Sequence, residues 1–188
     1  MKKLVLLLTS LLSFTSAAAA PAVDTKAVED VFLRYWGAYA KKDFAKAAAD
    51  MLPSDLEATK AEVLQVFLAG QTSKNREAQE VLGAFFAKTV GSARAAMPAT
   101  AVFAGLNRVV AAGSPEMFEA FNQSTVSIIF VRAIDADTAE VHFQITVRGV
   151  SEADAEILVR ENGRWWVKVK DNPREAAASF KELFARPA

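Results

Sequence analysis

The chain of 188 residues contains no cysteine and a single histidine, His142. Without cysteine it can form no disulfide, use no thiol as a nucleophile and bind no metal through thiolates. With one histidine, every catalytic triad would have to include His142, and the scattered carboxylates have no recognisable metal-ligand spacing. The sequence therefore predicts no metal and no cofactor.

The chain also lacks an excess of charge, because 22 basic residues balance 22 acidic ones. No basic stripe is present, so the sequence predicts no binding to nucleic acid. Glycine-rich phosphate loops and a serine in a nucleophile elbow are missing as well. Ser92 and Ser114 follow glycines at expected helix ends, where serine is an ordinary capping residue.

The first twenty residues have the pattern of a secretory signal peptide. Lys2 and Lys3 precede the mostly apolar run Leu4 to Leu12, and small alanines follow. The apolar run is well short of the roughly 20 residues that span a bilayer, so we expect cleavage near residues 19–22 rather than an anchor. The mature chain, 21–188, is expected to be periplasmic or secreted, not membrane-embedded, and one domain.

Apolar residues at three- and four-residue spacing predict helices over most of the chain before residue 123. The first is expected from about Thr25 to Lys41. Asp43 is a candidate N-cap for a short helix that Pro53 ends, and Ser54 with Glu57 forms a capping-box pattern for the next helix. Further helices are expected to end near Gly91 and to begin at Pro98.

From Thr125 the apolar period changes to two, which predicts strands over about 125–134, 138–148, 155–161 and 164–170. Short separators, including the hairpin signal Asn162-Gly163, favour an antiparallel meander. Asn172-Pro173 is expected to begin a last helix. The fold class is therefore α+β, with N-terminal helices packed on a four-stranded sheet and a helix at the C-terminus.

Strand parity predicts which side chains face the helices. A first turn at 135–138 would place Phe130 opposite Phe143 on an apolar inner face, and His142 on the outer face. Arg132 is the one polar residue assigned to the inner face, so no general base is expected there. The C-terminal helix or another subunit is expected to cover part of the outer face.

Three stretches, at residues 31–55, 139–149 and 155–169, together resemble the NTF2-like superfamily of cystatin-like α+β cones. This superfamily includes scytalone dehydratase and ketosteroid isomerase. The first stretch is similar to the family's long aromatic helix with its following step, here Lys42-Asp43, and the others to its closing strands. The chain departs from the family in a helical insertion at about 72–122 and in its last helix. Its architecture is also similar to MlaC-type periplasmic phospholipid-binding proteins.

The resemblance implies a cavity inside the cone. The residues expected to line it are aromatic: Tyr35, Trp36, Tyr39, Phe67, Phe130, Phe143 and Trp165. In the enzymes of the family, tyrosines in such cavities donate hydrogen bonds to substrate oxygen. The alternative, which we favour, is that Tyr35 and Tyr39 are core aromatics whose hydroxyls reach the rim.

Three functions stay open, in this order. The first is a non-catalytic exported domain that binds an apolar small molecule or lipid. The second is an interaction or homodimerisation module. Its outer sheet face would carry Ile129, Val131, His142, Ile157, Val159 and Trp166. The third is a dehydratase- or isomerase-like enzyme, which needs a carboxylate near Tyr35 or Tyr39.

Overall fold

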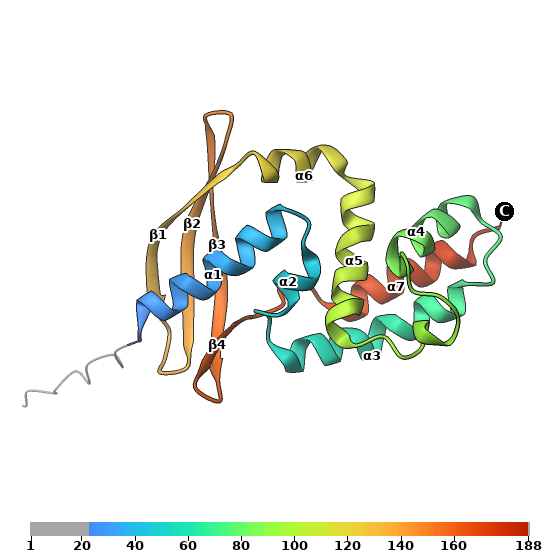
Figure 1. Cartoon of the computed structure of the whole chain (residues 1–188), viewed down its shortest axis with the longest axis horizontal. Helices are drawn as coiled ribbons and strands as arrows, with labels where there is room; N and C mark the ends of the chain where they lie inside the picture. Colours follow the sequence, from blue (N-terminus) through green and yellow to red (C-terminus); the bar gives the residue numbers. More distant parts are fainter. Residues whose placement is uncertain (1–22, 188) are drawn as a thin grey trace, which may run out of the picture.

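The computed structural model describes residues 23–187, so the expected leader and its cleavage site lie outside the described residues. Helices come first, four strands follow, and a helix comes last, which is the predicted α+β class (Figure 1). In chain order the elements are α1 (Thr25–Ala40), α2 (Phe44–Ala48), α3 (Pro53–Gly70), α4 (Arg76–Phe86), the 3₁₀ turn η1 (Gly91–Arg94), α5 (Ala99–Gly113), α6 (Pro115–Asn122), β1 (Thr125–Ala133), β2 (Thr138–Val147), β3 (Val150–Glu161), β4 (Arg164–Val167) and α7 (Pro173–Ala185).

The sheet is an antiparallel meander in the order β1-β2-β3-β4. Two-residue turns close its second and third hairpins, and both residues of each turn have positive φ. The values are 51° and 82° at Arg148 and Gly149, and 54° and 76° at Asn162 and Gly163. This is type I′ geometry, whose twist matches the strands that it joins. The predicted Asn162-Gly163 turn is confirmed, whereas β3 begins five residues earlier than expected.

The parity expected for β2 is confirmed. Ala139, Val141 and Phe143 are buried against the helices. His142 lies on the opposite face, beside Glu140, with its Nε2 atom 2.8 Å from the Glu140 Oε2 atom. The inner face therefore carries the apolar residues of β2, and the outer face carries its polar ones.

A register shift in β1 overturns the expected position of Phe130. Ile128 pairs with Phe143, but Phe130 pairs with His142, because Ile129 forms a bulge between them. A bulge reverses the facing of every later residue in the strand. The Phe130 ring consequently stacks on His142 with centroids 4.2 Å apart on the outer face. Val131 turns inward and packs against the core instead of joining the outer surface.

Helix α1 crosses the inner face of the sheet, as Figure 1 shows. Phe32 on α1 packs on Phe143 with ring centroids 4.6 Å apart. Trp165 and Val167 of β4 are buried in the same cluster. We call this group of side chains the sheet cluster.

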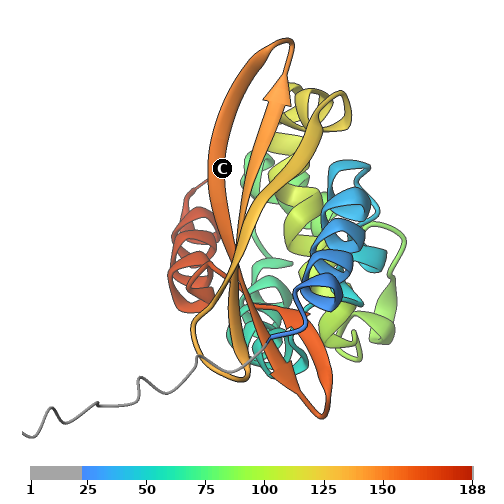
Figure 2. The same ribbon diagram turned by 90° about the vertical axis from the view of Figure 1, so that its left-hand side faces the viewer.

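A second apolar cluster lies among helices α3, α4, α5 and α7, and we call it the helical cluster. Phe67 stacks on Phe85 with centroids 3.7 Å apart and meets Phe180 and Phe184 of α7 edge to face. Helix α7 thus packs on α3 and not against the sheet, so of the two expected covers of the outer face only another subunit stays a prediction. In Figure 2 the strands run from top to bottom, with α1 to their right and α7 to their left.

Two helix N-termini form as predicted. The Asp43 carboxylate accepts a hydrogen bond from the Lys46 N–H at 3.3 Å, and the Asn172 side chain accepts one from the Arg174 N–H at 3.1 Å. Each satisfies a backbone donor that the helix itself leaves free.

Other helix boundaries differ from the prediction. Helix α3 begins at Pro53 without a capping box. Proline suits the first helical position, so the N-cap is Leu52, two residues before the expected Ser54. Asp55 instead accepts a hydrogen bond from the Val169 N–H at 3.1 Å. Helix α4 ends at Phe86, before the expected Gly91. The next residue, Ala87, has a positive φ of 45°.

Gly105 of α5 lies against the backbone of α4. A Cβ atom added there would lie 2.9 Å from the Phe85 carbonyl oxygen, whereas one added at Gly83 would meet nothing within 4 Å. We expect Gly105→Ala to destabilise the protein by about 1–3 kcal/mol, because backbone cannot move aside. Gly83→Ala should stabilise it by about 0.5–1 kcal/mol through helix propensity. Urea unfolding measures the change in free energy of unfolding for each variant. Equal changes of the same sign would contradict the close approach of Gly105 to the α4 backbone.

Candidate functional site

A cavity of about 540 Å³ lies between the inner face of the sheet and helices α1, α5, α6 and α7. Residues of the sheet cluster and residues packed against the helical cluster both border it. So do Tyr39 and Phe121, which pack against a third apolar cluster around Phe44 and Phe118. The side chains around it are Tyr35, Trp36, Tyr39, Met51, Thr59, Phe103, Leu106, Asn107, Val110, Met117, Phe121, Ile145, Asp154, Glu156, Lys168, Val169, Lys170, Asp171, Pro173, Ala176, Ser179 and Phe180.

The α1 side of this cavity is aromatic. Tyr35 and Tyr39 are one helical turn apart and their ring centroids are separated by 5.8 Å. Trp36 lies between them in sequence, 6.4 Å from the Tyr39 ring, and meets Phe121 of α6 edge to face. Leu106 and Val110 of α5 line the same cavity. Apolar and aromatic walls of this kind are typical of small-molecule sites.

The sheet side of the cavity carries charge. Lys170, which follows β4, has its Nζ atom 3.3 Å from both carboxylate oxygens of Asp154 and 3.4 Å from the Glu156 Oε2 atom. Asp154 and Glu156 are alternate residues of β3, so they point to the same, inner face. Glu156 is only 8% exposed, whereas Asp154 is exposed. The result is one buried carboxylate that shares a single lysine with a second carboxylate.

Burial raises the pKa of Glu156 from its ordinary value of 4.5 to about 7, with smaller contributions from the nearby charges of Asp154 and Asp171. Lys170 opposes this rise, but one partly exposed ammonium group does not offset the loss of water around the carboxylate. Glu156 therefore exchanges a proton near neutral pH, which few protein carboxylates do.

Sequence reasoning missed Glu156, and the expectation that the inner face has no carboxylate is wrong. A signal was present in the sequence. Leu158 and Val167 were expected to pair, and they do pair with both side chains buried. Glu156 lies two residues before Leu158 on the same strand, so it must share that inner face.

The tyrosine hydroxyls of the cavity stay protonated. Burial raises the pKa of Tyr39 to about 12 and raises that of Tyr35 further, with the charge of Glu156 as the second cause at Tyr35. Within residues 23–187 neither hydroxyl forms a hydrogen bond with another protein group. Each is therefore a free donor toward a molecule in the cavity.

Comparison of the chain with protein-family models, curated proteins and solved structures finds no match. What the structure shows is an α+β fold with a four-stranded antiparallel sheet, which is compatible with a cone. Across residues 23–187, no helix combines the length and the apolar character that crossing a bilayer requires. The same residues contain no group of three or more His, Asp or Glu side chains placed to hold a metal ion.

The seven residues expected around a cavity are separated by the structure. Tyr35, Trp36 and Tyr39 line the cavity. The remaining four do not border it. Phe143 and Trp165 are packed in the sheet cluster, Phe67 is packed in the helical cluster, and Phe130 lies on the outer face.

The outer sheet face carries most of the residues expected at an interface. Ile129 is 54% exposed, and the Trp166 ring is covered by the Arg164 guanidinium at 3.9 Å. The hydrogen bond from His142, with help from Arg132, lowers the pKa of Glu140. These groups satisfy one another within the chain, and the use of this face as an interface stays a prediction.

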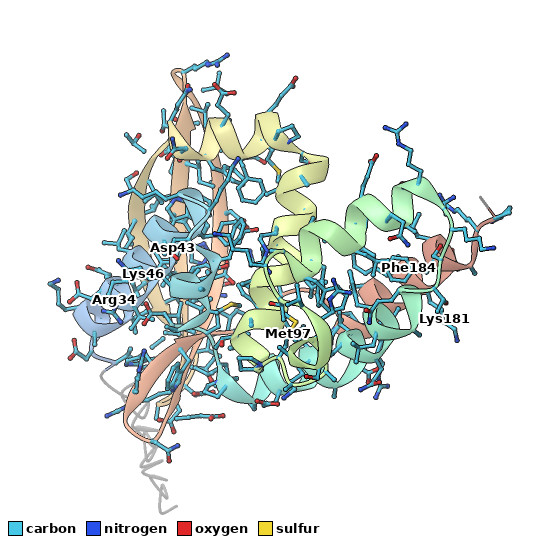
Figure 3. The ribbon with its side chains drawn as sticks, turned by 45° about the vertical axis from the view of Figure 1, so that its right-hand side comes forward. Arg34, Asp43, Lys46, Met97, Lys181 and Phe184 are labelled. Carbon is cyan, nitrogen blue, oxygen red and sulfur yellow. The ribbon has the colours of Figure 1, made fainter. Side chains whose placement is uncertain are left out.

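A second concavity, of about 640 Å³, lies between α3 and α7 at the end of the molecule far from the sheet. Phe184 and Lys181 of α7 border it (Figure 3). Its lysines and its arginine are exposed, and no buried ionisable side chain enters it within the described residues. We therefore take the cavity at Glu156 as the candidate site.

The raised pKa of Glu156 predicts a pH dependence of stability. A carboxyl group that binds its proton more tightly when folded contributes fully below pH 4.5, and this contribution is lost as the pH rises to about 7. Below pH 4.5, Glu156→Gln should have the same free energy of unfolding as the wild type. Above about pH 7, its free energy of unfolding should be higher by up to about 3 kcal/mol. Urea unfolding at a series of pH values measures the difference. A pH-independent difference between the two proteins would contradict the shift.

Proposed function

We propose that this protein is an exported NTF2-like domain that binds an apolar or amphipathic small molecule between its sheet and its helices. The leader pattern supports export, and the three aromatic residues of α1 around the cavity support the NTF2-like interpretation. The binding role is supported by one observation above all, the cavity itself.

Two properties of the cavity favour a ligand over empty packing space. Its volume of about 540 Å³ falls within the range of about 300–1,000 Å³ that small-molecule sites occupy. Its walls are mainly aromatic and aliphatic. The charged groups lie on β3 and the segment after β4, and Thr59, Asn107 and Ser179 add neutral polar groups from helices α3, α5 and α7. An amphipathic molecule would bury its apolar part against α1 and α5 and place its polar group near Glu156.

A bulky residue in the cavity should abolish binding. Ala176 of α7 borders the cavity, whereas Ala178 on the same helix is exposed and does not. We expect wild type and Ala178→Trp to bind the apolar dye Nile red, and Ala176→Trp to bind it at least about tenfold more weakly, because the indole occupies the space. Fluorescence titration measures this. Equal binding by the two variants, or none by the wild type, would contradict the proposal.

A second candidate is proton-transfer catalysis of the isomerase or dehydratase kind. The observation that favours it is Glu156, a carboxyl group with a pKa near neutrality in the same cavity as the Tyr35 hydroxyl. A base with such a pKa and a protonated hydroxyl could remove a proton beside a carbonyl and stabilise the resulting oxygen anion. We rank catalysis second for two reasons. Glu156 forms an ion pair with Lys170, and within residues 23–187 it forms no hydrogen bond with Tyr35.

Deuterium exchange distinguishes the two candidates. If Glu156 acts as a base, a medium-chain ketone in heavy water should acquire deuterium next to its carbonyl faster with wild type than with Glu156→Gln. Mass spectrometry measures the incorporation. Binding of the ketone with no exchange above the solvent rate would leave the carrier role and exclude this reaction for the ketone.

A further inference from the structure

The charged groups around the cavity are unequal in sign. Three are acidic and two are basic: Asp154, Glu156, Asp171, Lys168 and Lys170. Among the described residues, no arginine or histidine borders the space. When Glu156 is ionised, the lining therefore carries one net negative charge.

The best-placed cation of the site is already in use. Lys170 contacts both oxygens of Asp154 and one of Glu156, all within 3.3–3.4 Å. An anionic ligand could recruit Lys170 only by separating it from these carboxylates and by approaching them itself. A carboxylate or phosphate headgroup would therefore meet like charge in a partly dehydrated space.

A cationic headgroup meets the opposite situation. Glu156 is buried and shares its single lysine with Asp154, so an ammonium group would supply the charge balance that this carboxylate lacks. The rings of Tyr35, Trp36 and Tyr39 on the same cavity add faces on which a cation is attracted by the ring quadrupole. Carboxylate and aromatic faces together are a common setting for amine recognition.

We propose that the ligand of this cavity is a single-chain amphiphile with a protonated amine, its head beside Glu156 and its chain against α1 and α5. This inference rests on the proposed binding function. It goes further by naming the chemical class of the headgroup.

Matched amphiphiles test the proposal. Dodecylamine, dodecanol and dodecanoate share one chain and differ in headgroup charge, and each is titrated below its micelle concentration by isothermal calorimetry. Near pH 8, dodecylamine should bind about tenfold more tightly than dodecanol, and dodecanoate should bind most weakly.

Lysophosphatidylethanolamine is a fourth ligand, which tests whether the amine can belong to a lipid headgroup. If it binds as tightly as dodecylamine, a lipid headgroup is a suitable source of the amine, and weaker binding indicates a simple amine.

The pH dependence should differ in sign among the three ligands. The groups that face Glu156 across the cavity are Tyr35 and Tyr39 from α1, Asp154 from β3, and Lys168, Lys170 and Asp171 from the segment after β4. Burial raises the pKa of Glu156 to about 7, which lies inside the pH range of this test. From about pH 6 to about pH 8, dodecylamine binding should strengthen up to about tenfold as Glu156 ionises, and dodecanoate binding should weaken. Dodecanol binding should stay constant.

Two variants separate the headgroup effect from the chain effect. Glu156→Gln should weaken dodecylamine binding to the level of dodecanol and remove its pH dependence, with dodecanol unaffected. Glu161→Gln, the same change on an exposed residue of β3, should behave as wild type. Lys170→Met frees both carboxylates and should strengthen dodecylamine binding. If Lys170 were instead the headgroup receptor for an anion, this variant would abolish dodecanoate binding and leave the amine unimproved.

The outcomes distinguish the inference from the function on which it rests. Equal binding of the three ligands, or tightest binding of dodecanoate, would overturn the amine proposal and leave the binding cavity standing. If none of them binds and Nile red does not bind either, both proposals fail. Circular dichroism melting of each variant confirms that lost binding does not reflect lost folding.

Discussion

The pairing of residues 50–52 with strand β4 is the constraint on which the rest of the structure depends. The Val167 N–H donates to the Asp50 carbonyl, and the Leu52 N–H donates to the Val167 carbonyl, both at 2.9 Å. The buried Asp50 carboxylate also accepts hydrogen bonds from Arg34 of α1 at 3.0 Å and from Arg164 of β4 at 3.1 Å. These bonds tie the first helices to the last strand. Both arginines are about half exposed, but losing the two of them would leave a buried carboxylate without a partner, which is destabilising. The same bonds also fix the segment after Val167, which brings Lys170 and Asp171 to the cavity.

The cavity lies among apolar clusters that pack as separate groups. Phe32 anchors α1 on the sheet through Phe143, and Phe67 anchors α7 on α3 through Phe180. Each contact is close-packed, and Glu156 lies at the border of the sheet cluster, next to the buried Leu158 on the inner face and to the exposed Asp154. Because α7 belongs to the helical cluster, it lies across the cavity from β3 and not on the outer sheet face. The space between the clusters is thus a consequence of the two sets of phenylalanines and needs no special loop.

Local signals in the sequence predicted the elements well, and the failures have physical causes. Asp43, Asn172-Pro173 and Asn162-Gly163 act on their immediate neighbours, so their effects could be predicted without tertiary structure. The bulge at Ile129 left no sequence signal, because an apolar residue suits either face, and it moved Phe130 to the outer surface. The start of β3 was placed too late, since its first residues are small or acidic and do not alternate with apolar ones. That error left Asp154 outside the expected strand, whereas Glu156 lay inside it and its inward facing could have been inferred from Leu158.

Glu156 links the stability of the fold to the proposed function. A carboxyl group held away from water destabilises the folded protein wherever it must ionise, so the empty cavity is least favourable above the pKa of this group. A bound cation would compensate the charge and recover that free energy, and it would stabilise the folded state in proportion to its own binding. A simple structural core would have no reason to keep an acid at this position, because an apolar residue would pack there without a desolvation cost. The same dehydration that weakens the empty protein at neutral pH is therefore what would make the occupied cavity selective for charge.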